Sequence, residues 1–222
     1  MTPSHAPSTI VITGASDGIG AISARALAGP DVNLVIVGRS GDKLARVAGD
    51  TGATALTADF ARLAAATGAL VVNTSSIGNN VGRVDLTDLD FERRHAFQTR
   101  CYGTSKLENI LFTRGIADRW APERIVSAAV HPGPVATSFG RDSTVMGLVY
   151  RTPLRHVLAI TPEKGAAPLI ALARRGADEA INGVYFHRHR ADGPQSRQAR
   201  DPRLITGLWD ASAALVGLDS GS

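Results

Sequence analysis

A tyrosine and a lysine four residues apart could carry out proton transfer in this chain. Tyr102 and Lys106 stand at the two ends of the segment YGTSK. On a helix this spacing places both side chains on one face, with their Cβ atoms about 5–6 Å apart. A nearby ammonium stabilises a phenolate, so Tyr102 is a candidate general acid or base towards a carbonyl or an alcohol.

Residues 13–20 could bind the phosphates of a dinucleotide, since they read TGASDGIG. Glycines permit a tight turn and let backbone N–H groups approach a pyrophosphate, and a following helix adds partial positive charge. The loop follows a strand-like run at 9–13 and precedes a helix-like run at 18–28, which favours a cofactor loop over a structural turn. The expected contacts are Gly14, Ser16, Asp17, Gly18, Ile19 and Gly20.

Arg39 bears on the choice of cofactor. An acidic residue at the end of the second strand would bind the ribose 2′-OH of NAD(H), whereas an arginine accommodates the 2′-phosphate of NADP(H). The chain has Gly38-Arg39-Ser40 there and no acid before Asp42. Because a guanidinium can pair with a phosphate through two hydrogen bonds, the sequence favours NADP(H) over NAD(H).

Alternating strands and helices are predicted to position these residues. Apolar, β-branched runs predict buried strands at 9–13, 33–37, 53–59, 69–74, 125–130 and 183–187. Helical patterns cover 18–28, 42–48, 100–120, 161–174 and 201–216, with a less regular one at 137–159. This alternation predicts an α/β fold with a parallel sheet covered on both faces. Residues 1–8 are predicted to be a flexible tail and 9–217 a single domain.

Composition excludes several classes of protein. No apolar run approaches the about 18 residues of a membrane span. Residues 1–8 lack the basic flank and the apolar stretch of a secretory signal, so no such signal is expected. A single cysteine, Cys101, allows no internal disulfide and indicates a reducing compartment, so a cytoplasmic location is expected. The net charge is +4, but the basic residues are dispersed and lack aromatic interleaving, which argues against nucleic-acid binding. No metal site is predicted.

Three motifs together resemble the short-chain dehydrogenase/reductase family: TGASDGIG at 13–20, VNTSS at 72–76 and the YxxxK pair. The resemblance implies a Rossmann-type, doubly wound parallel sheet. It also implies that Ser76 orients the substrate oxygen, with Ser75 as the alternative. Tyr102 would exchange the proton, and Lys106 would hold the nicotinamide ribose.

The resemblance extends to further cofactor contacts. Asp59 would lie by the adenine, and the segment HPGPVAT would run along the nicotinamide, with contacts from Pro132, Gly133, Val135 and Thr137. The strings YGTSKLENILFTR, TPEKGAAPL and GVYFHR resemble the retinol-dehydrogenase and protochlorophyllide-reductase-like branch, whose substrates are often apolar aldehydes, ketones or alcohols. Residues 138–160 would form a substrate lid. Its apolar candidates, which core packing explains equally well, are Phe139, Met146, Leu148 and Tyr150.

The chain lacks a segment that the family possesses. Only nine residues, 60–68, separate Asp59 from the strand at 69–74. In the family this interval holds a helix, a strand ending in Asn-Asn-Ala-Gly and a long helix that supplies a catalytic asparagine and part of the dimer interface. A parallel crossover usually takes a dozen or more residues. Nine residues span only about 14 Å as a helix or ~30 Å when extended. We therefore expect six strands, with 69–74 paired directly to 9–13. Proton relay would take another route, and any oligomer would form elsewhere.

The sequence thus predicts an NADP(H)-dependent oxidoreductase acting on a carbonyl or alcohol of a small, apolar substrate. Two alternatives stay open because of the missing segment. One is non-redox chemistry on the same fold, with Tyr102 and Ser76 serving a dehydratase, cyclase or isomerase. The other is a non-catalytic dinucleotide-binding protein.

Overall fold

The computed structural model describes residues 8–38, 40–56, 69–93, 97–133 and 161–215. The chain divides into two compact units. The first contains residues up to Leu70 together with Pro132–Ala177, and the second contains Val71–His131 and the residues from Asp178 onward.

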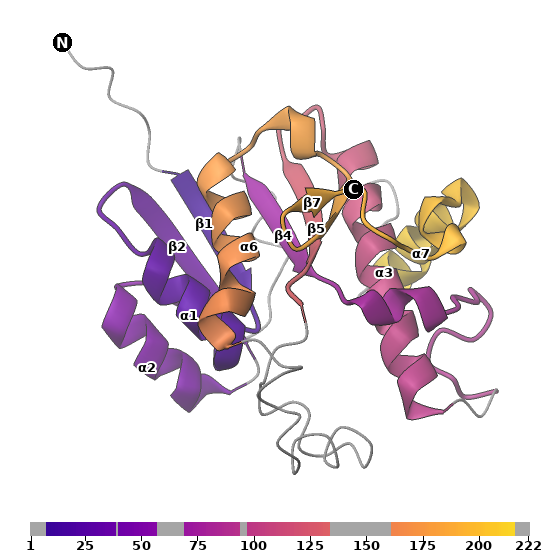
Figure 1. Ribbon diagram of the computed structural model, residues 1–222, viewed down its shortest axis with the longest axis horizontal. Helices are drawn as coiled ribbons and strands as arrows, with labels where there is room; N and C mark the ends of the chain where they lie inside the picture. Colours follow the sequence, from indigo (N-terminus) through magenta and orange to yellow (C-terminus); the bar gives the residue numbers. More distant parts are fainter. Residues whose placement is uncertain (1–7, 39, 57–68, 94–96, 134–160, 216–222) are drawn as a thin grey trace. The chain divides into compact units, whose positions relative to one another are not determined.

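Three parallel strands form the sheet of the first unit (Figure 1). Strand β1 (Ser8–Thr13) pairs along its length with β2 (Val32–Val37), and β3 (Thr54–Leu56) joins the far side of β2. Helices α1 (Gly18–Leu27) and α2 (Gly41–Thr51) connect these strands, and α6 (Pro162–Arg175) packs beside α1. The strands are apolar because their side chains fill a core that includes Ile12, Leu34, Ile36, Leu44 and Val47.

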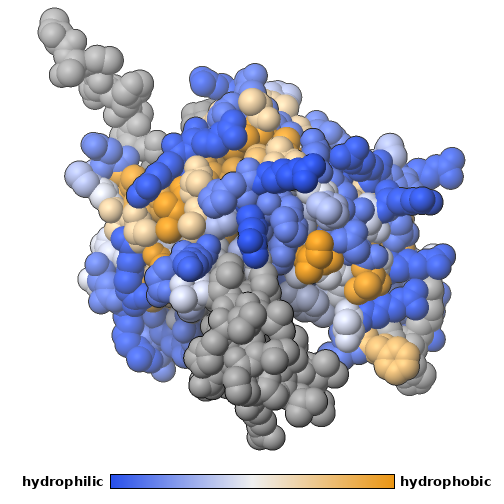
Figure 2. All heavy atoms as spheres, in the orientation of Figure 1, coloured by the Kyte–Doolittle hydropathy of each residue, from blue (hydrophilic) through white to orange (hydrophobic). Residues whose placement is uncertain are grey.

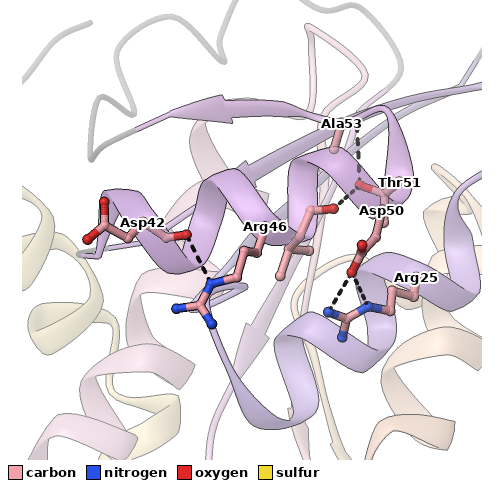
Figure 3. Close-up of polar contacts among 7 residues, drawn as sticks. Arg25, Asp42, Arg46, Asp50, Thr51 and Ala53 are labelled. Atoms are coloured by element: carbon pink, nitrogen blue, oxygen red, sulfur yellow. Dashed lines mark hydrogen bonds and ion pairs between the residues drawn. The ribbon is translucent and has the colours of Figure 1, made fainter.

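Polar contacts fasten α2 to α1 and close its C-terminal end (Figure 3). Arg25 of α1 donates two hydrogen bonds to Asp50 of α2, from Nε at 3.0 Å and Nη2 at 2.9 Å. Thr51 Oγ1 donates to the Val47 carbonyl at 2.7 Å and accepts from the N–H of Ala53 at 3.3 Å. The last turn of α2 therefore leads directly into β3.

The second unit is built around one long helix, α3 (Gln98–Arg119), which packs against β5 (Val126–His131). Strand β6 (Val184–His187) runs parallel to β5, and the two-residue β7 (Arg190–Ala191) is antiparallel to β6. Helix α7 (Pro202–Leu215) lies on α3, where Trp209 stacks on Phe112 with ring centroids 5.3 Å apart. Short 3₁₀ helices complete the unit: η2 (Ile77–Val81), η4 (Glu179–Ile181) and η5 (Arg197–Arg200).

Strand β4 (Leu70–Thr74) confirms the pairing expected from the shortened connection. Its first residue, Leu70, pairs with Ile10 of β1 in parallel. At its other end, the N–H of Ser75 donates to the Val130 carbonyl of β5 at 2.8 Å. The hydrogen-bonded order is β3-β2-β1-β4-β5-β6-β7, so no described strand separates β1 from β4.

The predicted α/β, Rossmann-type fold is therefore confirmed. The predicted count of six strands is wrong, because the described residues form seven. The extra one is β7, which is too short to leave an apolar pattern and arises from the hairpin after His187. Residues 57–68, which include the link after β3, and the helix predicted at 137–159 lie outside the described residues.

Hydrophilic residues cover most of the face drawn in Figure 2, with hydrophobic residues gathered in smaller groups between them. In the described part of the chain, no helix combines the length and the apolar character that crossing a membrane would require.

Candidate active site

Glycines bring the turn after β4 against the N-terminal part of α3. A Cβ added at Gly82 would collide with the Gly103 carbonyl, and one at Gly103 would lie 2.6 Å from the carbonyl oxygen of Gly78. The 3₁₀ helix η2 therefore lies backbone to backbone on α3. Because Ser76 caps η2 and Tyr102 precedes Gly103, this packing places both predicted catalytic residues in one region.

The two neighbouring serines have different surroundings. Ser75 is 2% exposed, and its Oγ donates to the Lys106 carbonyl at 2.7 Å. Ser76 is half-buried, and its Oγ accepts from the N–H of Gly78 at 3.2 Å. An oxygen that accepts this bond keeps its own hydrogen for another acceptor. Ser76, unlike Ser75, can therefore donate to a substrate oxygen.

Ser76 and Tyr102 both border Gly78. A Cβ at Gly78 would lie 3.1 Å from Cε1 of Tyr102 and 3.6 Å from Oγ of Ser76. The Tyr102 residue is 36% exposed, so its ring is accessible to a small molecule. The structure thus brings together two of the predicted catalytic residues across a glycine.

Lys106 completes the group. Its Nζ lies 5.6 Å from the centroid of the Tyr102 ring and donates to the Thr74 carbonyl at 3.3 Å. Burial of the side chain lowers the pKa of Lys106.

Asn109 is a residue of this site that sequence reasoning missed. Its Nδ2 donates to the Thr74 carbonyl at 2.9 Å, the same oxygen that accepts from Lys106. One turn further along α3, Thr113 Oγ1 donates to the Asn109 carbonyl at 2.7 Å and accepts from Asn73 Nδ2 at 2.8 Å. The spacing of three residues from Lys106 was a usable signal, since it places Asn109 on the same helix face.

The glycine loop of the first unit has the backbone that phosphate binding requires. Gly14 and Gly18 have φ of +67° and +54°, values that suit glycine. A Cβ at Gly20 would collide with the Gly14 carbonyl, so the loop turns tightly into α1. The first N–H groups of a helix have no partner within it and carry partial positive charge. The residues present therefore fit a dinucleotide pyrophosphate.

Asp17 and Lys43 add charged groups beside this loop. Asp17 caps α1, where its Oδ1 accepts from the N–H of Gly18 at 2.8 Å, and its Oδ2 accepts from Lys43 Nζ at 2.9 Å. The hydrogen bond from Lys43, aided by that from Gly18, lowers the pKa of Asp17. The carboxylate is therefore paired with a cation of α2, which offsets its negative charge near the loop.

Other predicted contacts fall in different places. Pro132 and Gly133 follow β5, and Gly133 has a φ of +102°. The remaining predicted residues lie outside the described residues: Arg39, Asp59, Val135, Thr137 and the apolar lid candidates Phe139, Met146, Leu148 and Tyr150.

Three titratable side chains of the second unit were not predicted as site residues: His131, His187 and Glu108. The imidazoles of His131 and His187 lie with ring centroids 4.9 Å apart at the ends of β5 and β6. Burial, followed by the charges of His187 and Arg188, lowers the pKa of His131 to about 4. Burial raises the pKa of Glu108 on α3 to about 7. In the described residues, no group of histidines, cysteines and acids could hold a metal ion.

Comparison with known proteins decides the family. The family model described as short chain dehydrogenase matches residues 8–87, which include the glycine loop and Ser76. The chain belongs to the short-chain dehydrogenase/reductase family. A proposed daunorubicin C-13 ketoreductase from Streptomyces sp. (strain C5) is 29% identical to this short-chain dehydrogenase/reductase, over 94% of its chain and 92% of the relative.

Human retinol dehydrogenase 13 is 30% identical over 72% of the chain and 50% of the relative. The chain thus spans about half the length of the retinol dehydrogenases that it matches. These relatives confirm the predicted branch of the family. The alignment with the ketoreductase covers 272 positions, so that relative carries residues that this chain of 222 lacks.

Solved structures show the same fold. An uncharacterized protein from Mycobacterium paratuberculosis has a TM-score of 0.69 at 22% identity, over 98% of this chain and 96% of that one. A short chain dehydrogenase from Burkholderia cenocepacia J2315, solved in complex with NADP, has a TM-score of 0.54 at 21% identity, over 82% of this chain and 97% of that one.

Proposed function

We propose that this protein is an NADP(H)-dependent oxidoreductase that interconverts a carbonyl and an alcohol on a small, apolar substrate. The observation that carries the proposal is the grouping of three side chains. Ser76 and Tyr102 flank Gly78, and the Lys106 ammonium lies 5.6 Å from the Tyr102 ring. The names of the relatives, a ketoreductase and retinol dehydrogenases, support the same type of reaction.

Each side chain has a distinct role in the proposed reduction. Tyr102 donates its phenolic proton to the carbonyl oxygen, and it takes that proton back from the alcohol in the reverse direction. Ser76 donates a hydrogen bond to the same oxygen. Its Oγ accepts from the N–H of Gly78, and this bond leaves the hydroxyl hydrogen for the substrate. Lys106 stabilises the phenolate left on Tyr102 and, by the family pattern, holds the nicotinamide ribose. When bound, the cofactor supplies the hydride.

The cofactor preference rests on the residues around the glycine loop. The loop would hold the pyrophosphate through Gly14, Gly18 and the N-terminus of α1. Arg39 would pair with the 2′-phosphate, and Lys43 adds positive charge close to Asp17 of the loop. The NADP complex of the Burkholderia protein, which shares the fold, is compatible with this preference.

The apolar character of the proposed substrate is supported by the surface around Tyr102. Two aliphatic side chains of η2 are exposed there, Ile77 at 45% and Val81 at 58%. Retinol, named in several of the relatives, is a largely apolar molecule. A substrate of this kind would gain free energy by covering such side chains.

The test is a fluorescence titration with NADPH, and in parallel with NADH. It is followed by turnover of aldehydes and ketones that include retinal and daunorubicin. We expect tighter binding of NADPH than NADH, and loss of NADPH absorbance only when a carbonyl is present. Failure to bind NADPH at millimolar concentration would contradict the proposal. Product formed without cofactor oxidation, and abolished in Tyr102→Phe, would establish non-redox chemistry instead.

A further inference from the structure

Asn79 lies beside the candidate site, and its side chain is buried and hydrogen-bonded at both polar atoms. It lies in η2 and is fully buried, with 0% of its surface exposed. Its Nδ2 donates to the Ser76 carbonyl at 2.7 Å and to the Tyr185 hydroxyl at 3.3 Å. Its Oδ1 accepts from the N–H of Ser196 at 2.8 Å. Both amide hydrogens and the amide oxygen are therefore used.

These partners come from distant parts of the chain. Tyr185 lies on β6, and Ser196 precedes η5. The Tyr185 ring is fully buried, and burial raises the pKa of its phenol to about 12, so it is a neutral, fixed acceptor. Asn79 thus connects the turn that carries Ser76 to two other elements of the second unit.

The Ser76 carbonyl is held twice by the same residue. It accepts from Nδ2 of Asn79 and also from the Asn79 backbone N–H at 3.1 Å. The side chain of Ser76 is held separately, since its Oγ accepts from the N–H of Gly78. Fixing the carbonyl restrains the peptide after Ser76 and therefore the turn in which the N–H of Gly78 binds the Ser76 Oγ.

We propose that Asn79 is a positioning residue for Ser76 in the carbonyl–alcohol reaction. It does not touch the substrate and acts only through the serine. The inference rests on the proposed function, in which Ser76 donates to the substrate oxygen. Removing the two donated bonds of Asn79 should then slow the chemical step only while Ser76 is present.

Asn80 is a matched control. It is adjacent and of the same type, but it is exposed, and its Nδ2 donates to the carbonyls of Ile77 at 3.1 Å and Pro194 at 3.4 Å. The substitution Asn79→Asp keeps the shape and the acceptor for Ser196 but loses both donations when ionised. Asn80→Asp makes the same chemical change without affecting Ser76.

The experiment is a double-mutant cycle on the full chain. NADPH-dependent reduction of the best carbonyl is measured for the unaltered protein, Asn79→Asp, Ser76→Ala and the double variant, with thermal unfolding of each. We expect Asn79→Asp to lower kcat about tenfold with little change in KM, and to lower it less than twofold in the Ser76→Ala background. Asn80→Asp should leave kcat unchanged.

Two results overturn the inference alone: kcat retained by Asn79→Asp, or an equal loss with and without Ser76. An unaltered protein that reduces no carbonyl overturns the proposed function and this inference with it. If Asn79→Asp does not fold, Tyr185→Phe removes one acceptor of Nδ2 and preserves the packing. It should lower kcat two- to fivefold, again only when Ser76 is present, and an equal loss without Ser76 would refute the inference.

Discussion

Ser76 and Tyr102 can approach each other because residue 78 has no side chain. The position of a Cβ there, 3.1 Å from the Tyr102 ring, is tighter than most side-chain contacts. The ring is partly exposed and can move, so a small side chain at residue 78 would displace the ring rather than unfold the turn.

Gly78→Ala should therefore lower the kcat of carbonyl reduction about tenfold while the melting temperature stays within a few degrees. The added methyl pushes the phenol away from the oxygen that Ser76 holds, and misplacements of this order are costly to catalysis. Steady-state kinetics and thermal unfolding check this. Gly49→Ala is the control, because no atom of the described part of the chain lies within 4 Å of its Cβ position on α2. An unchanged kcat in Gly78→Ala would show that the two residues do not act together.

Glu108 makes stability depend on pH. Its pKa is raised from 4.5 to about 7, and its Oε1 is buried with no hydrogen-bond partner among the described residues. The folded protein therefore binds more protons than the unfolded chain between these pH values, so the free energy of unfolding falls as pH rises from about 4.5 to 7.

Glu108→Gln should remove this dependence. At pH 8 we expect the variant to unfold with about 1–2 kcal/mol more free energy than the unaltered protein, and at pH 4.5 with no such gain. Urea denaturation at the two pH values measures the difference. The exposed Glu123→Gln should show no difference at either pH, and an equal effect of Glu108→Gln at both would exclude ionisation as the cause.

At the scale of elements, the sequence predicts strands and helices well where one periodic pattern dominates. β1, β2 and β5 are continuous apolar runs, and α1 is bounded by the glycine loop and by Gly29-Pro30. The 3₁₀ helix η2 falls in none of the helices and strands predicted from the sequence, because its stability comes from the hydrogen bonds of Asn79 to distant residues and from contact with α3 rather than from a periodic apolar pattern.

The sequence predicts the residues of the candidate site but not the packing that brings them together. Motif spacing identifies Ser76, Tyr102 and Lys106, but their approach depends on Gly78, Gly82 and Gly103, whose partners are distant in sequence. The support from Asn79 and Asn109 likewise requires tertiary contacts. Motif spacing thus indicates which residues are candidates for catalysis, whereas the packing that holds them is visible only in three dimensions.

The glycine loop gives a prediction about the connection between β1 and α1. In Gly20→Ala the added methyl meets the backbone carbonyl of Gly14, which cannot move as a side chain would. We expect NADPH affinity to fall at least tenfold, together with a lower melting temperature. Fluorescence titration and thermal unfolding test this with Gly49→Ala as the control. Undiminished NADPH affinity would show that the loop does not hold the cofactor.

At the scale of the whole molecule, the residues assigned to the cofactor loop and to proton transfer are divided between the two units. Strand β4 pairs directly with β1, and the described pairing between them consists of one residue pair, Ile10 with Leu70. A dinucleotide that binds the folded protein but not the unfolded chain would stabilise the protein against unfolding.

NADPH should therefore raise the melting temperature. At a concentration of about 100 times its Kd, a ligand of the folded state adds about 2.7 kcal/mol, which corresponds to about 5–10 °C for a chain of this size. Differential scanning fluorimetry with NADPH, NADH and adenosine checks the size and the order of the shifts. An equal shift with NADPH and NADH would contradict the proposed preference for NADP(H).

The most direct test of the account is a single-turnover reaction of the NADPH-loaded protein with a carbonyl substrate, comparing the unaltered chain with Tyr102→Phe. Loss of the phenolic hydroxyl should slow cofactor oxidation by about 10²–10⁴-fold and leave NADPH affinity within about twofold. Cofactor oxidation at an undiminished rate in Tyr102→Phe would contradict the assignment of Tyr102 as the proton donor.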